Sequence, residues 1–140
     1  MSDYGKGEYR ILVATENVVQ SHLVRSALER AGYGVLMAAS GDEAVDWLTA
    51  ESSLPDLVLV DAEIPGISAF EVIGTLRYLD RRDEVPVVLR TEALDEGTQV
   101  ACLAAGVDAW LPIPAEQRVL LETVARLVPT ASESGHRIAV

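Results

Sequence analysis

Short apolar runs alternate with amphipathic segments along most of the chain. The runs are rich in Val, Ile and Leu and are bounded by polar or turn residues, as in strands that are buried on both faces of a parallel sheet. Between them, apolar residues recur at intervals of three and four, as on one face of a helix. The expected strands are residues 10–14, 35–38, 55–61, 86–89 and 109–111. The expected helices are 18–30, one that opens with the capping pair Ser40 and Glu43, 70–79, 95–105 and 116–128.

Five successive strand–helix units predict an α/β fold with helices on both faces of a parallel sheet, because right-handed crossovers place them there. The strand order 2-1-3-4-5 fits this number of units and gives a doubly wound sheet. This order places the first and third strands side by side. The residues that follow Ala14 should therefore meet the residue that ends the third strand.

The third strand ends in a lone carboxylate. The apolar run 57–60 is followed by Asp61 and then by the turn residues 64–66. Open α/β folds bind ligands at this carboxyl edge of the sheet. Glu16, after the first strand, and the hydroxyl of Thr91, after the fourth, should reach the same crevice. Two carboxylates with nearby oxygen donors suit Mg²⁺. Asp61 is then a candidate nucleophile toward a phosphoryl group, with the metal neutralising the developing charge.

Composition narrows the functional classes. The chain has 140 residues, is 49% hydrophobic and carries a net charge of −11, so we expect one globular domain that does not bind nucleic acid directly. The apolar runs are too short to cross a bilayer and the N-terminus has no signal pattern, so no membrane association is expected. The single cysteine, Cys102, suits a buried structural thiol in the cytoplasm. We expect residues 9–128 to form the domain, residues 1–8 a flexible N-terminal tail, and residues 129–140 a flexible tail or linker.

These segments together resemble the receiver domain of two-component response regulators. The matching pieces, in order, are residues 15–17, 31–35, 55–61, 64–66, 86–91, 105–111 and Pro114. The resemblance covers nearly everything from residue 9 to residue 128. It implies a flavodoxin-like (βα)5 fold and a signalling switch rather than an ordinary enzyme.

The same resemblance implies the chemistry and the partners. A histidine kinase or phosphotransfer protein would phosphorylate Asp61, with Mg²⁺ held by Glu16, Asp61 and the backbone carbonyl of Glu63. Thr91 matches the switch hydroxyl and Trp110 the aromatic that changes rotamer with it. The fourth-strand, fourth-helix and fifth-strand surface would then change for a downstream effector protein or domain. Receivers often pair, so the resemblance also makes a homodimer of this chain a candidate assembly.

Several positions depart from the receiver pattern. Thr15 replaces the first acidic residue of the pair, Ile113 replaces the lysine that pairs with the phosphoryl group, and Glu92 replaces a small residue. Each lost charged partner costs on the order of 1.5–3 kcal/mol, which weakens phosphoryl binding. Arg90 stands where an apolar residue is common. Because Arg90 and Thr91 point to opposite faces of the strand, we expect Arg90 to extend to the surface rather than to replace the missing cation.

Three functions remain open at this point. The first is a receiver with impaired or atypical phosphorylation of Asp61. The second is a pseudo-receiver, a protein-interaction module that works without phosphorylation. The third is a small flavodoxin-like enzyme or nucleotide binder, which is disfavoured because the chain has no glycine-rich phosphate loop.

Overall fold

A parallel sheet forms the centre of the molecule. The structure, a computed structural model, describes residues 9–50, 54–80 and 84–128. The strands are β1 (Arg10–Ala14), β2 (Gly34–Ala38), β3 (Leu57–Asp61), β4 (Val87–Thr91) and β5 (Ala109–Pro112). They are parallel and lie in the order β2-β1-β3-β4-β5. The strand order expected from the sequence is confirmed.

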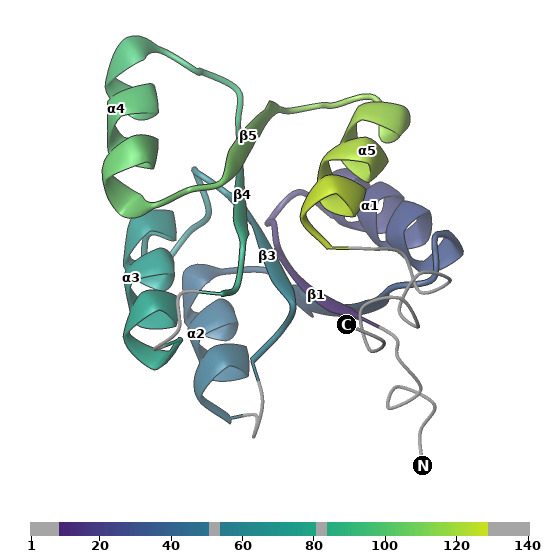
Figure 1. Ribbon diagram of the computed structural model, residues 1–140, viewed down its shortest axis with the longest axis horizontal. Helices are drawn as coiled ribbons and strands as arrows, with labels where there is room; N and C mark the ends of the chain where they lie inside the picture. Colours follow the sequence, from purple (N-terminus) through teal and green to yellow (C-terminus); the bar gives the residue numbers. More distant parts are fainter. Residues whose placement is uncertain (1–8, 51–53, 81–83, 129–140) are drawn as a thin grey trace.

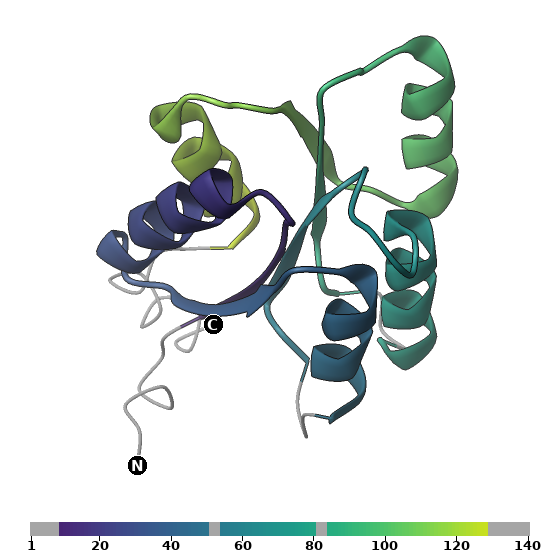
Figure 2. The same cartoon turned by 180° about the vertical axis from the view of Figure 1, so that it is seen from behind.

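Helices cover both faces of this sheet (Figure 1). They are α1 (Val18–Arg30), α2 (Gly41–Ala50), α3 (Ala69–Leu79), α4 (Glu96–Ala105) and α5 (Gln117–Leu127). The helices α1 and α5 lie on one face, and α2, α3 and α4 lie on the other, as the reverse view also shows (Figure 2). None of the helices in the described ranges has both the length and the apolar composition that a bilayer span requires.

Each face of the sheet has its own apolar core, because successive side chains of a strand point to opposite sides. On the α1/α5 side, Leu57 and Leu59 of β3 pack with Val88 of β4. On the other side, Val58 and Val60 pack with residues of α2, α3 and α4, including the fully buried Cys102. Burial raises the pKa of the Cys102 thiol. The expected structural role of Cys102 fits this position.

Strand β4 is longer than the apolar pattern indicates. The expected strand ends at residue 89, whereas β4 continues through Arg90 and Thr91. Both residues belong to the ladder, since Arg90 pairs with Asp61 on β3 and Thr91 pairs with Pro112 on β5. Because Arg90 and Thr91 are polar, a prediction based on hydrophobicity ends the strand before them. The expected tails, residues 1–8 and 129–140, lie outside the described residues.

The helices on the α2/α3 side begin at polar caps. The Ser40 hydroxyl accepts a hydrogen bond from the Glu43 backbone N–H at 3.1 Å, but the Glu43 carboxylate accepts from the backbone of Ala39 instead of Ser40, so only half of the expected capping box forms. A complete capping box, which was not among the expected features, joins Ser68 and Glu71 at the start of α3. These caps fix where the chain leaves the carboxyl edge of the sheet.

Helix α4 has an acidic cap that makes its stability depend on pH. The Asp95 carboxylate accepts a 2.8 Å hydrogen bond from the backbone N–H of Thr98, and this bond, together with the hydrogen bond to the Thr98 side chain, lowers the pKa of Asp95. A lowered folded-state pKa stabilises the protein above the unfolded value, near 3.8, and the contribution is lost as the pH falls through the folded value. We therefore expect Asp95→Ala to destabilise the protein at about pH 6, and this difference from wild type to shrink at about pH 3. Urea unfolding of both proteins at the two pH values measures it, and an equal difference at both would contradict the charge-based cap.

Candidate functional site

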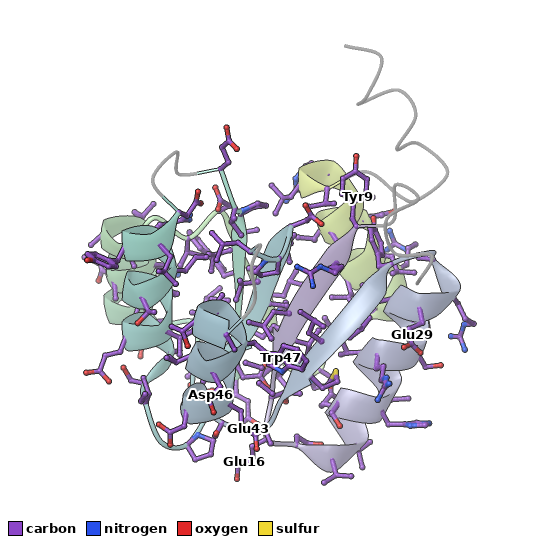
Figure 3. All side chains as sticks on the ribbon, turned by 90° about the horizontal axis from the view of Figure 1, so that it is seen from below. Tyr9, Glu16, Glu29, Glu43, Asp46 and Trp47 are labelled. Atoms are coloured by element: carbon purple, nitrogen blue, oxygen red, sulfur yellow. The ribbon has the colours of Figure 1, made fainter. Side chains whose placement is uncertain are left out.

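The loops that follow the strands meet at the carboxyl edge of the sheet. Ala14 lies beside Val60 in the register of β1 and β3, so the residues after both strands emerge together. They border an open cavity of about 480 Å³. Its carboxylate lining comes from Glu16, Asp61, Glu63 and Glu92, and its apolar lining includes Val18, Val19 and Ile113. Figure 3 shows Glu16 at this edge, at the opposite end of the sheet from Tyr9. The expected meeting of Glu16 with Asp61 at one cavity is therefore found.

A buried arginine, Arg90, forms an ion pair with the Asp61 carboxylate. The Arg90 Nε donates to Asp61 Oδ1 at 2.7 Å, and Arg90 Nη2 donates to Oδ2 at 3.1 Å. The Arg90 side chain is 2% exposed and that of Asp61 is 10% exposed. The third nitrogen, Nη1, donates to the amide oxygen of Gln20 on α1 at 3.1 Å. The guanidinium thus binds both carboxylate oxygens in a fork, the strongest geometry for such a pair.

The expectation that Arg90 extends to the surface is wrong, and the sheet register explains why. Arg90 and Thr91 do point to opposite faces, but Arg90 lies directly beside Asp61 in the ladder, so these two side chains share a face. One feature of the sequence did indicate this pair. Arg90 is a charged residue in the otherwise apolar β4, and the neighbouring strand β3 ends in the Asp61 carboxylate. Gln20, which completes the arrangement from α1, carries no signal in the sequence.

Thr91 lies on the other face and reaches the cavity through Glu63. Its hydroxyl donates to Glu63 Oε2 at 3.0 Å and accepts from the backbone N–H of Ala93 at 3.1 Å. Thr91 itself is buried, at 2% exposure, whereas Glu63 is exposed. The Thr91 hydroxyl therefore holds the Glu63 carboxylate in place at the cavity.

Two of the residues that depart from the receiver pattern line the cavity that Asp61 borders. Ile113 and Glu92 line the cavity, so an apolar side chain and an extra negative charge stand there. Thr15 is buried, and its hydroxyl accepts from the backbone N–H of Asn17 at 3.4 Å. Ile113 contributes no charge to the cavity and Glu92 contributes a negative one, so neither side chain supplies positive charge beside Asp61.

Trp110, the expected switch aromatic, lies in β5 beside Leu89 of β4. Its side chain is partly buried against the core on the α2/α3/α4 side of the sheet. This is the face onto which Thr91 points, so a movement of the hydroxyl and a change of the Trp110 rotamer would occur on the same side.

The donor set does not fit a divalent cation in this arrangement. Among the described residues, no group of three or more His, Cys, Asp or Glu side chains is gathered closely enough to hold a metal ion. Both oxygens of Asp61 already accept hydrogen bonds from Arg90, and one Glu63 oxygen accepts from Thr91. Mg²⁺ requires oxygen ligands in near-octahedral geometry, so Arg90 would have to release Asp61 before this carboxylate became a free ligand.

Comparisons of this chain with known proteins all point to the same family. Residues 11–125 match the model of the response regulator receiver domain. The chain is 34% identical over 110 residues to the transcriptional regulatory protein AfsQ1 of Streptomyces coelicolor, covering 79% of this chain and 46% of that protein. It is 27% identical over 114 residues to the polar-differentiation response regulator DivK of Brucella anthropi, covering 81% and 91%. The crystal structure of a CheY-like receiver domain protein from Methanospirillum hungatei superposes with a TM-score of 0.78 at 25% identity, covering 93% of this chain and 98% of that one.

The chain spans about half the length of some of these relatives. The aligned region covers 46% of AfsQ1 and 53% of the phosphate regulon transcriptional regulatory protein PhoB of Rhizobium meliloti. It covers nearly all of DivK. The shared part is therefore the unit that the parallel sheet and its helices form.

Proposed function

The chain belongs to the response regulator receiver domain family, whose members act in two-component signalling, and we propose that it accepts a phosphoryl group on Asp61 with impaired efficiency. The observation that carries this proposal is the position of Asp61 at the end of β3, on a cavity that it shares with Glu16 and Glu63. An oxygen of Asp61 would form the new O–P bond while the bond from phosphorus to the leaving group breaks and the leaving group keeps the electron pair.

The surroundings of Asp61 support impairment. Ile113 offers no charge to the phosphoryl oxygens, and Glu92 adds a negative one at the same cavity. The pair with Arg90 lowers the availability of both carboxylate oxygens. Receiver domains generally bind Mg²⁺ in an acidic pocket, and we propose that Glu16, Asp61 and the Glu63 carbonyl form a weakened version of that site when Arg90 releases Asp61.

The proposed partners follow from this role. A histidine kinase or a phosphotransfer protein would supply the phosphoryl group in the cytoplasm, and an effector protein or domain would respond. Val100 and Leu103 on α4 are 61% and 69% exposed. These apolar side chains support the α4 and β5 side as the surface that an effector, or a second copy of the chain in a homodimer, would bind. Receiver domains are typically signalling modules and not conventional enzymes.

Incubation with a small phosphodonor tests the proposal. We expect the full chain, treated with acetyl phosphate or phosphoramidate and Mg²⁺, to gain one phosphoryl group slowly in intact-mass spectrometry. Asp61→Asn should remove the modification, because the amide is not a nucleophile toward phosphorus. Labelling that persists in Asp61→Asn would contradict the assignment of the acceptor.

A phosphorylation-independent pseudo-receiver is the second candidate, and the buried Arg90–Asp61 pair is the observation that favours it. The same experiment decides between the two. Absence of labelling in the wild-type chain at saturating donor and Mg²⁺ would reject the first function and favour the second.

A further inference from the structure

We propose that Arg90 is an internal counter-ion, which occupies Asp61 in the place of a divalent cation and so gates phosphoryl transfer to this residue. The inference rests on the proposed function only for the role of Asp61 as acceptor. The occupancy of the carboxylate by Arg90 is a feature of the structure itself.

The geometry gives Arg90 control over both Asp61 oxygens. A receiver reaction requires one oxygen for the cation and one for phosphorus, and the guanidinium contacts both, at 2.7 and 3.1 Å. A cation on Asp61 would also lie within a few ångströms of the guanidinium, where like charges repel strongly in a partly buried setting. Arg90 and a divalent cation therefore compete for Asp61, and only one of them can bind it at a time.

Burial makes this competition favour the arginine. Arg90 as a whole residue is 1% exposed, and its side chain is the largest fully buried one among the described residues. A guanidinium that has lost its water needs its acceptors, and Asp61 provides two of them and Gln20 a third. A metal ion must therefore compensate for the loss of a desolvated ion pair as well as for its own dehydration.

A neighbouring cavity gives Arg90 a place to withdraw. It measures about 150 Å³, lies between α1 and α5, and is lined by Arg90 with Gln20, Gln117 and apolar side chains that include Val24 and Leu120. Asp61 borders the acidic cavity but not this one. The Gln117 amide oxygen there accepts one hydrogen bond, from Arg30 at 3.4 Å, and its second lone pair can accept a guanidinium N–H from Arg90 after Arg90 leaves Asp61.

Gln20 connects this gate to α1. Its amide oxygen holds Arg90 Nη1 at 3.1 Å, while its backbone N–H donates to the Asn17 cap of the same helix at 2.9 Å. A displacement of the first turn of α1 would therefore move the acceptor that keeps the guanidinium beside Asp61. The state of the gate is linked to the position of this helix.

Mg²⁺ titration of the full chain, followed by amide NMR shifts at Glu16, Asp61 and their neighbours, tests the gate without depending on phosphorylation. Arg90→Val restores the apolar residue common at this position, and Arg90→Met fills more of the same volume. We expect both variants to bind Mg²⁺ about tenfold more tightly than wild type or better, the scale of one charged hydrogen bond. Phosphorylation by acetyl phosphate should accelerate in the same variants.

Arg126→Met is the matched control, because it removes the same charge from an exposed position on α5 that does not line either cavity. Its Mg²⁺ affinity should stay at the wild-type value. Gln20→Leu keeps Arg90 and the fold while removing one acceptor, and should give a smaller increase in Mg²⁺ affinity in the same direction. If the Arg90 variants fail to fold, this variant decides the question.

The outcomes separate this inference from the proposed function. Labelling of Arg90→Val but not of wild type would uphold the gate and reject phosphorylation of the wild-type chain. Tighter Mg²⁺ binding without labelling of any variant would uphold Arg90 as the counter-ion that competes with Mg²⁺ for Asp61, and would reject both Asp61 as an acceptor and the gating of phosphoryl transfer. Mg²⁺ affinities of folded Arg90 variants, or of Gln20→Leu where those do not fold, that equal the wild-type value would overturn the gate.

Discussion

Asp61→Ala is expected to lower the free energy of unfolding by about 3–5 kcal/mol, although the substitution removes a residue from the edge of a cavity. The reason is the partner that remains. Arg90 would keep its positive charge at 1% exposure with Gln20 as its remaining side-chain acceptor. A buried ion pair adds little stability over apolar residues of similar size, but removal of one member leaves an unpaired buried charge. Urea unfolding followed by circular dichroism measures the loss.

A double substitution provides the control for this prediction. Asp61→Ala combined with Arg90→Met removes both charges, so most of the lost stability should return, and a double-mutant cycle gives the coupling between the two residues. A single variant that unfolds within about 1 kcal/mol of wild type would show that the Arg90 side chain reaches water once Asp61 is gone.

Gly41→Ala is expected to cost about 3 kcal/mol or more, because the new methyl group meets backbone. A Cβ at position 41 would lie 1.7 Å from the carbonyl oxygen of Ile67 and 2.6 Å from its carbonyl carbon. The same glycine donates its N–H to the carbonyl of Pro65 at 2.9 Å, so the start of α2 is held against the segment that leads into α3. Neither backbone can move without breaking this contact. Thermal unfolding of the variant measures the cost.

Gly74 provides the opposite case within the same molecule. It lies on the exposed side of α3, and a Cβ there would meet nothing within 4 Å. Gly74→Ala should therefore stabilise the protein by about 0.5–1 kcal/mol through the higher helix propensity of alanine. Equal melting temperatures for Gly41→Ala and Gly74→Ala would contradict the close approach at Ile67.

The fold could be predicted from the sequence because the information is distributed along the chain. Each of the five apolar runs indicates a strand independently, and the strand–helix alternation restricts the topology to very few arrangements. The meeting of Glu16 with Asp61 then follows from strand order alone, since β1 and β3 are neighbours. No side-chain detail is required for these conclusions.

The detail of the site required register, which the sequence does not determine. The pairing of Asp61 with Arg90 depends on how β3 and β4 are aligned, and a shift by one residue would place the two side chains on opposite faces. Similarly, the Thr91 hydroxyl lies within reach of Glu63 because of the conformation of the loop after β3. Contacts between side chains from different loops carry no periodic signal along the chain.

The source of the positive charge beside Asp61 affects how receivers without the usual lysine should be classified. In this chain the charge comes from Arg90 on β4, next to Asp61, and Ile113, at the position after β5 where the receiver pattern has a lysine, is apolar. A survey that inspects only the customary lysine would classify such a protein as lacking any cation. An arginine inside a strand and a lysine in the loop after a strand have different effects on the same carboxylate. Surveys of divergent family members should therefore count charged residues in the neighbouring strands as well as at the lysine position.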